Sequence, residues 1–362
     1  MNNSAKKFFF IVQGEGRGHM TQAISLYEML TNAGHNVCAV MVGKSKRRVI
    51  PDFFYKKINT EIILFESPNF VTDKKSKAIK IGATIWNNLL RGAVFIKNLS
   101  VIDKEIKKHN PDVVINFYDL LAGMYFWFYH PKPEYVCVGH QYLLLHPDFQ
   151  FPKKRSVEKF LVKLNTRITQ KRASKLLALS FREFPHYTKQ NIYVVPPLLR
   201  KEVLNIVPQN KNFILGYMVN SGYGEDMIQW HEKNKHVVFH IFWDNKDVQD
   251  EYKPHENITF HHLNDKKFLE YMANCTAYVS TAGFESICEA MYLGKPVMMV
   301  PIKGQYEQLC NAHDAAQAGA GIMSDDFNIN KLIDYLPSHK TDYSEFKKWV
   351  MQAKEKILKE LS

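Results

Sequence analysis

Apolar residues gather in short runs along the first half of the chain, and longer stretches with helical spacing separate these runs. The runs predict strands near residues 8–12, 37–42, 60–66, 112–117, 134–139 and 175–180, with a last strand from Ile192 to Val195 before two prolines. Runs without polar alternation are typical of strands that are buried on both faces of a parallel sheet. Their alternation with helices predicts a doubly wound α/β domain.

The second half of the chain repeats the same arrangement. Strands are predicted at 213–218 and near 236–242, 258–262, 277–280 and 297–300, and helices at 265–274, 284–293 and 305–318. A chain of 362 residues is too long for one compact core. We therefore expect a first α/β domain at 1–197, a linker at 198–212, a second α/β domain at 213–341 and a last amphipathic helix at 342–362.

A glycine turn opens the helix that follows the strand at 277–280. Gly283 lets the backbone approach a ligand closely, and the helix that starts at Phe284 offers unpaired N–H groups to an anion such as a diphosphate. Ser286 adds a hydroxyl donor in the first turn. Glu289 lies one turn later, and its two carboxylate oxygens can accept from both hydroxyls of a ribose.

Two further loops are expected at the same edge of the second sheet. The strand at 297–300 ends before a polar loop with Glu307, Gln308 and Asn311, whose side chains suit the hydroxyls of a sugar. The loop that contains Gly222 follows the strand at 213–218. Because open α/β sheets bind ligands at the carboxyl ends of their strands, we expect both loops to face one cleft.

A glycine loop also follows the first predicted strand, with Gly14, Gly16, Arg17, Gly18 and His19. Its spacing differs from the G-x-G-x-x-G of dinucleotide-binding proteins, and the second strand does not end in an acidic residue that could bind a ribose. The spacing therefore disfavours NAD.

The segment 280–312 resembles the donor-binding segment of GT-B glycosyltransferases, in the style of the plant and animal glucosyl and glucuronosyl transferases and of the lipid-linked N-acetylglucosaminyltransferase of peptidoglycan synthesis. The resemblance implies that Gly283, Ser286 and Glu289 bind the diphosphate and ribose, and that Glu307, Gln308 and Asn311 bind the donor sugar. Thr281 stands where these families place a phosphate-binding His or Ser. The resemblance also implies two Rossmann-like domains that face each other across a cleft, with the C-terminal helix crossing back to the first domain.

The glycine loop that ends in His19 resembles the N-terminal motif of the same enzymes, in several of which the matching histidine removes the acceptor proton. An imidazole oriented by a carboxylate suits this task. Asp119 and His140 both follow predicted strands and are expected at the cleft, Asp119 as the residue that orients His19.

Simpler structural roles remain open for several of these residues. Asp119 can be the N-cap of the helix at 120–129, and Thr281 can be only a cap. Glu285 and Glu289 can be charges on the surface or in the first turn of their helix.

The composition is that of a globular protein, with 46% hydrophobic and 23% charged residues. The five cysteines form no C-x-x-C pair, as expected of reduced thiols in the cytosol, and no secretory segment stands at the N-terminus. The chain contains no Asp-x-Asp. We therefore expect no metal and no cofactor other than the nucleotide-sugar co-substrate.

A formal net charge of +12 indicates an anionic partner. Basic clusters lie at 44–48, 74–80 and 153–155, and the second precedes an apolar stretch with Trp86, a pattern that suits an anionic membrane surface on the inner face of the cell membrane. A helix packed within its own domain is the alternative. Nucleic acid is disfavoured as a partner because the chain carries no recognisable reading motif.

The sequence thus predicts an inverting, metal-independent glycosyltransferase that uses a nucleoside diphosphate sugar, expected to be UDP-linked, and a hydroxyl acceptor that includes lipid or cell-envelope glycans. A nucleotide-sugar 2-epimerase of the same fold is the alternative enzyme. A non-catalytic protein that binds nucleic acid is the alternative from another class.

Overall fold

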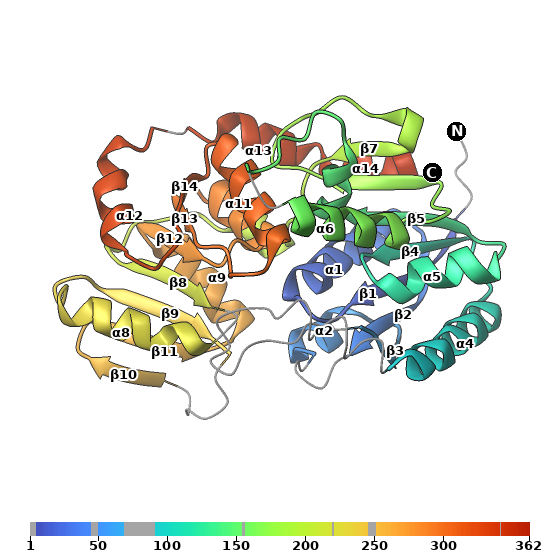
Figure 1. Cartoon of the computed structure of the whole chain (residues 1–362), viewed down its shortest axis with the longest axis horizontal. Helices are drawn as coiled ribbons and strands as arrows, with labels where there is room; N and C mark the ends of the chain where they lie inside the picture. Colours follow the sequence, from blue (N-terminus) through green and yellow to red (C-terminus); the bar gives the residue numbers. More distant parts are fainter. Residues whose placement is uncertain are drawn as a thin grey trace.

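The structure is a computed structural model that describes residues 5–44, 50–68, 91–153, 156–218, 221–244, 251–340 and 342–362. Within these ranges the chain forms two seven-stranded sheets with helices packed against them, and the two domains lie side by side (Figure 1). The prediction of two doubly wound domains is confirmed. The basic residues 74–80, the stretch around Trp86, residues 45–49, and Lys154 and Arg155 lie outside the described residues.

The first sheet is parallel throughout, because helices connect its strands. Its strands are β1 (Lys7–Gln13), β2 (Asn36–Lys44), β3 (Glu61–Glu66), β4 (Val113–Phe117), β5 (Glu134–Gly139), β6 (Lys175–Leu179) and β7 (Ile192–Val195), in the spatial order β3-β2-β1-β4-β5-β6-β7. Its helices are α1 (Arg17–Asn32), α2 (Asp52–Lys57), α4 (Gly92–His109), α5 (Leu120–Tyr129) and α6 (Ser156–Thr169), and the 3-10 helix η1 (His140–Leu145) follows β5. The order reverses between β1 and β4, and ligands of such folds bind at this switch point.

The second sheet has the same plan. Its strands are β8 (Ile214–Met218), β9 (Phe239–Trp243), β10 (Glu251–His255), β11 (Ile258–His262), β12 (Ala277–Ser280), β13 (Val297–Met299) and β14 (Gly321–Met323), in the spatial order β10-β11-β9-β8-β12-β13-β14. Its helices are α8 (Gly224–Glu232), α9 (Asp265–Asn274), α10 (Phe284–Tyr292), α11 (Tyr306–Gln317) and α12 (Asn330–Tyr335). The edge strand β10 pairs antiparallel with β11, and neither β10 nor β14 was predicted.

The strands are buried because their apolar runs face helices on both sides. Phe8, Phe9, Phe10, Ile11 and Val12 of β1 are fully buried, as are Val297, Met298 and Met299 of β13. The strands thereby fix the loops at their carboxyl ends, and these loops carry the predicted site.

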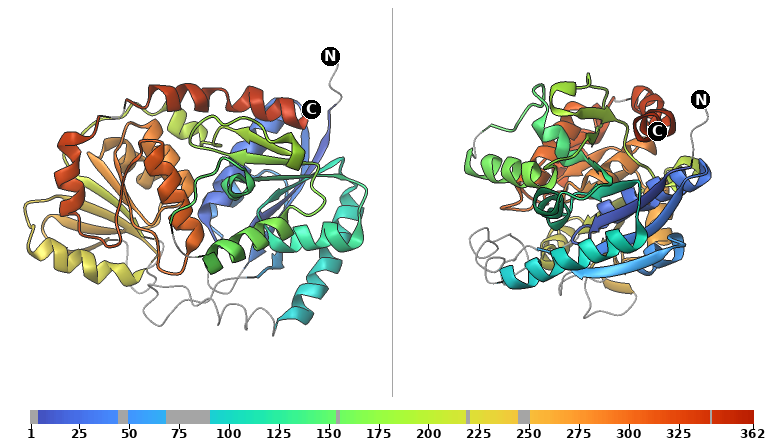
Figure 2. Two further views of the ribbon diagram at one scale, coloured as in Figure 1. Left: turned by 45° about the horizontal axis from the view of Figure 1, so that its top comes forward. Right: turned by 90° about the vertical axis from the view of Figure 1, so that its right-hand side faces the viewer.

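The chain returns to the first domain at its C-terminus. The single helix predicted at 342–362 is instead two, α13 (Ser344–Met351) and α14 (Ala353–Leu361), which run along one edge of both domains (Figure 2, left). Trp349 Nε1 donates to the carbonyl of Ser180 at 2.9 Å, and Lys6 Nζ donates to the carbonyl of Leu361 at 3.0 Å. The predicted crossing back to the first domain is therefore confirmed. Among the described helices, none has the length and apolar character that a membrane span requires.

Candidate active site

A cavity of about 230 Å³ lies between the two domains and takes residues from both. Most of the predicted site residues line it: Gly16, Arg17, Gly18, His19, His140, Gly283, Phe284, Ser286, Glu289, Glu307, Gln308 and Asn311. Four predicted residues of the described chain lie outside this lining: Gly14, Asp119, Gly222 and Thr281. The two predicted halves of the site therefore meet in one cavity.

Gly14 and Thr281 have structural roles that packing explains, and Gly222 lies elsewhere in the second domain. A Cβ on Gly14 would lie 2.0 Å from the carbonyl oxygen of Gly43, so Gly14 allows the loop after β1 to pack against β2. Thr281 is buried in the turn after β12, and Gly222 lies in the 3-10 helix η3 (Ser221–Tyr223). None of these three residues lines the cavity, and their contacts with a ligand stay predictions.

The start of α10 is the anion-binding feature on the side of the second domain. Gly283 is its N-cap and no side chain caps the helix, so its first N–H groups stay open to the cavity. Ala282 has a φ of 62°, a left-handed conformation that is costly for a residue with a Cβ. Asn311 Nδ2 donates to the carbonyl of Ala282 at 3.1 Å and supports this turn.

Glu289 is buried and paired with Arg200, a residue of the interdomain linker. Arg200 Nε donates to Glu289 Oε1 at 2.6 Å and Arg200 Nη2 to Glu289 Oε2 at 2.7 Å, while Nη1 pairs with Asp265. Burial alone would lower the pKa of Arg200, but Glu289 and Asp265 raise it above its ordinary value. Glu289 is therefore a buried carboxylate at the cavity wall with its orientation fixed.

His19 lies in the first turn of α1 and is 8% exposed. Its Nδ1 lies 3.3 Å from Gln22 Oε1, and its Nε2 lies 3.3 Å from Gln141 Nε2. Burial lowers the pKa of His19 to about 4, so the ring is neutral at pH 7 and one of its nitrogens carries a lone pair.

Asp119 does not orient His19, and that prediction is corrected. Its Oδ1 accepts from the backbone N–H groups of Leu121 and Ala122, and its Oδ2 accepts from Ser67 Oγ at 2.6 Å. Burial raises the pKa of Asp119 to about 6. Asp119 is the N-cap of α5, the simpler role that its position after β4 allowed.

Two glutamates of the second domain bind glutamines of the first domain instead. Gln22 Nε2 donates to Glu285 Oε1 at 2.7 Å, and Gln141 Nε2 donates to Glu307 Oε1 at 2.8 Å. Burial raises the pKa of both carboxyls, that of Glu285 to about 8. Glu285 is 6% exposed, so its interpretation as a surface charge is wrong.

His140 closes the cavity from the first domain. Its ring stacks on Phe284 with centroids 4.2 Å apart, and Nδ1 donates to the carbonyl of Leu179 at 2.8 Å. Burial lowers the pKa of His140 to about 4. This stacking joins η1 to the start of α10 across the domain boundary.

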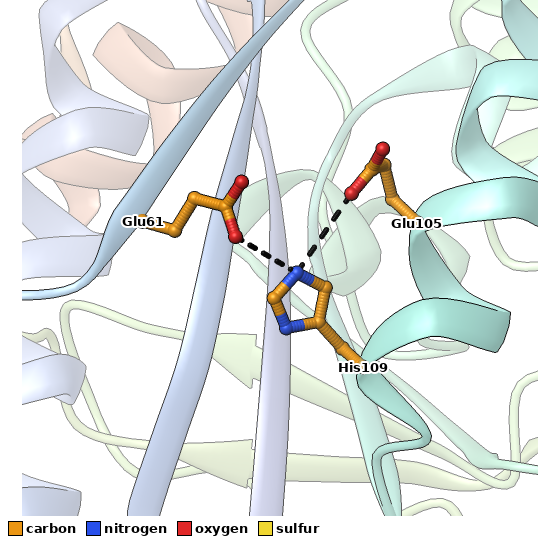
Figure 3. Close-up of side chains that lie close together, drawn as sticks. All are labelled: Glu61, Glu105 and His109. Carbon is orange, nitrogen blue, oxygen red and sulfur yellow. Dashed lines mark ion pairs between the residues drawn. The ribbon is translucent and has the colours of Figure 1, made fainter.

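Outside this cavity, the described residues contain one group with the atoms for a metal ion, Glu61, Glu105 and His109 (Figure 3). His109 Nε2 lies 3.1 Å from Glu61 and 3.8 Å from Glu105, while Lys108 Nζ binds both carboxylates at 2.9 to 3.2 Å. Lys108 already pairs with both carboxylates, so we interpret them as a surface ion-pair cluster that ties α4 to β3.

The sequence interpretation missed the residues that reach the cavity from other elements: Gln22, Gln141, Arg200, Asn264 and Asp265. Gln22 lies three residues after His19, which places both on one face of α1. This spacing is the only local indication that Gln22 reaches the cavity. Arg200 follows the proline pair after β7, in the segment for which the sequence predicts only a linker.

Two doubly wound domains that face a shared cavity, with a C-terminal segment returning to the first domain, define the GT-B class of glycosyltransferases. The model of glycosyl transferase family 1 matches residues 6–338, so this chain belongs to that family and is a glycosyltransferase. The resemblance inferred from the two motifs is confirmed. No curated protein sequence matches the chain.

Solved structures share the fold at low sequence identity. The glycotransferase of kitacinnamycin has a TM-score of 0.65 at 14% identity, over 99% of this chain and 100% of that one. UGT89C1 of Arabidopsis thaliana in complex with UDP-L-rhamnose has a TM-score of 0.64 at 13% identity, over 99% and 98%. MurG of Acinetobacter baumannii has a TM-score of 0.57 at 15% identity, over 98% of each chain.

Proposed function

We propose that the protein is an inverting, metal-independent transferase that moves a sugar from a UDP-linked donor to a hydroxyl acceptor. One observation carries the proposal: His19 and the uncapped start of α10 line one cavity from opposite domains. A base on one side and an anion site on the other are what the reaction requires.

The donor fits the side of the second domain. The open N–H groups of α10 suit the diphosphate, and Glu289 suits the ribose. Arg17 of the first domain lines the same cavity, and its guanidinium also suits the diphosphate. Gln308 and Asn311 lie at the wall where the sugar would be held. The likeness to a structure that contains UDP-L-rhamnose supports a UDP-linked donor.

The chemistry follows from this placement. The acceptor oxygen attacks the anomeric carbon, its proton passes to Nε2 of His19, and the bond from that carbon to the diphosphate oxygen breaks. The helix start and Arg17 stabilise the charge that develops on the departing UDP. Attack opposite to the leaving group inverts the configuration.

The acceptor belongs to a membrane or cell envelope in this proposal. Helices α5 and α6 pack together and expose Trp127, Phe128 and Tyr129 on one and Val157, Phe160 and Leu164 on the other. Lysines accompany them: Lys171 Nζ lies 5.5 Å from the Trp127 ring, and burial with the charges of Arg167 and Lys159 lowers the pKa of Lys163. Exposed aromatics among clustered cations suit an anionic lipid surface.

Three measurements test the proposal. Thermal shift across UDP-, GDP-, dTDP- and ADP-sugars should select a UDP-sugar. UDP release in EDTA should require an acceptor. The acceptors tested are a detergent-solubilised lipid extract and quercetin, which another structure of UGT89C1 contains. His19→Ala should reduce turnover about 10² to 10⁴-fold while UDP affinity by calorimetry stays within a few-fold. Conversion of a UDP-sugar without acceptor would favour the epimerase, and loss of activity in EDTA would refute metal independence.

A further inference from the structure

A chain of hydrogen bonds joins the base of the first domain to the second domain. His19 Nδ1 lies 3.3 Å from Gln22 Oε1, and Gln22 Nε2 donates to Glu285 Oε1 at 2.7 Å. The three side chains are 8%, 3% and 6% exposed, so water does not compete for these bonds. A Cβ on Gly18 would lie 3.4 Å from Glu285 Cγ, which shows how closely α1 approaches this glutamate.

The chain fixes which nitrogen of His19 carries the proton. Glu285 Oε1 accepts from Gln22 both when the carboxyl is ionised and when Oε2 carries its proton. The amide NH₂ of Gln22 therefore points to Glu285, and its carbonyl oxygen points to His19. A carbonyl oxygen can only accept, and Nδ1 of His19 must therefore carry the hydrogen. A neutral imidazole has one N–H, so the lone pair lies on Nε2.

A second amide on the other side of the ring agrees with this tautomer. Gln141 Nε2 donates to Glu307 Oε1 at 2.8 Å and lies 3.3 Å from His19 Nε2, where its other N–H can donate to the lone pair. An acceptor hydroxyl that approaches Nε2 takes the place of this amide. Glutamates of the second domain thus orient the amides on both sides of the base.

We propose that Glu285 is a positioning residue for His19: through Gln22 it holds the imidazole as the Nδ1–H tautomer, with Nε2 directed to the acceptor. The inference rests on the proposed role of His19 as the base. Asp119, the carboxylate predicted for this task, has its two oxygens bound to the start of α5 and to Ser67. Because Glu285 belongs to the second domain, His19 is held as the Nδ1–H tautomer only when the two domains are packed together.

The tautomer can be measured directly. Long-range ¹H–¹⁵N NMR of protein labelled with [¹⁵N]histidine distinguishes Nδ1–H from Nε2–H, and the His19 signal is assigned by its loss in His19→Gln. We expect Nδ1–H in the wild type and in Glu285→Gln, whose amide oxygen can still accept from Gln22. We expect an Nε2–H population in Glu285→Met, which has similar size and no acceptor.

Kinetics provide the second measurement. Glu285→Met should lower kcat about 10-fold or more with a smaller change in the acceptor KM, and Glu285→Gln should restore most of kcat. If Glu285→Met does not fold, Gln22→Met replaces it, with Gln22→Glu as the control whose carboxylate still accepts from Nδ1. A pure Nδ1–H signal in the Met variants, or kcat equal to the wild type, would overturn the inference.

The two proposals fail in distinguishable ways. The NMR measurement needs no substrate. If the His19 tautomer depends on Glu285 but the protein turns over no UDP-sugar, only the proposed reaction is contradicted. Turnover that needs His19 but not Glu285 would contradict only the positioning role.

Discussion

Arg200 of the interdomain linker holds Glu289 through two parallel hydrogen bonds, at 2.6 and 2.7 Å. Both carboxylate oxygens face the guanidinium, yet each keeps a second lone pair for a ribose hydroxyl. A ribose bound to Glu289 would therefore be linked through that carboxylate to Arg200. The Nη1 of Arg200 in turn binds Asp265. The proposed nucleotide site and the linker therefore share one ion-pair network.

The first prediction separates the ligand role of Glu289 from its role in the ion pair. Glu289→Ala should weaken UDP binding by roughly 2–4 kcal/mol, since charge-assisted hydrogen bonds are lost. It should also lower the free energy of unfolding, because Arg200 loses a partner in a buried site. Calorimetry with UDP and urea unfolding measure the two effects, and Glu256→Ala, an exposed glutamate of the same domain, is the control.

The double variant Arg200→Met with Glu289→Met sharpens that test. Replacement of both buried charges by apolar side chains should recover much of the unfolding free energy lost in Glu289→Ala. UDP affinity should stay weak, because no acceptor for the ribose returns. Recovery of UDP affinity in the double variant would show that Glu289 acts only as the partner of Arg200.

Asp119 provides the second prediction. Asp119→Ala should lower the free energy of unfolding by about 1–2 kcal/mol, since α5 loses its cap. Asp119→Asn should be milder, because asparagine is also a good N-cap, and turnover at saturating substrate should remain within a few-fold of the wild type. Urea unfolding and UDP release are the measurements. A large loss of turnover in a fully stable Asp119→Asn would return to Asp119 the orienting role that we propose for Glu285 and Gln22.

The fold was predictable because its strands are continuous apolar runs that leave little choice of structure. The strand at 258–262 and the helix at 265–274 have the bounds that the sequence predicted. β10 was missed because it is an edge strand of sequence EYKPH, with charged residues and a proline that a central strand would not tolerate. The break at Gln352 between α13 and α14 carries no proline or glycine, and the amphipathic pattern continues across it.

The site was predictable only where its residues lie close together in one segment of the sequence. Gly283, Ser286 and Glu289 lie within seven residues and follow a strand, so local spacing was enough to place them at the cavity. Gln22 and Glu285 are 263 residues apart, and nothing local indicates that they meet. Burial of Glu285 comes from the approach of α1, which is a tertiary effect.

The third prediction concerns the pH dependence of stability. Burial, together with Glu289, raises the pKa of Glu285 from 4.5 to about 8, while Gln22 and Arg200 act in the opposite direction. Between these values the folded state binds more protons than the unfolded state, so this group destabilises the fold progressively as pH rises from about 4.5 to about 8. Glu285→Gln does not titrate and should exceed the wild type in stability by a margin that grows over this interval.

Urea unfolding at several pH values measures that margin, which should reach the order of a few kcal/mol near pH 8. Glu256→Gln is the matched control, because an exposed glutamate should give no margin that changes with pH. An equal difference between wild type and Glu285→Gln at pH 5 and pH 8 would mean that Glu285 is not desolvated in the folded protein.

The last prediction concerns the exposed face of α5 and α6. Phe128 and Phe160 are 58% and 61% exposed and lie among lysines, so each ring can enter the interface of a bilayer whose anionic headgroups attract the cations. Phe128→Glu and Phe160→Glu should each reduce binding to vesicles of anionic phospholipid several-fold, because they remove apolar area and add a repelled charge. Val207→Glu, at a residue 81% exposed in the interdomain linker, should bind as the wild type does.

Vesicle flotation at low and high salt measures this binding. High salt screens charges and weakens their attraction to anionic lipid. A contribution from the basic residues would be contradicted if the wild type bound neutral and anionic vesicles equally, or if its binding did not change with salt.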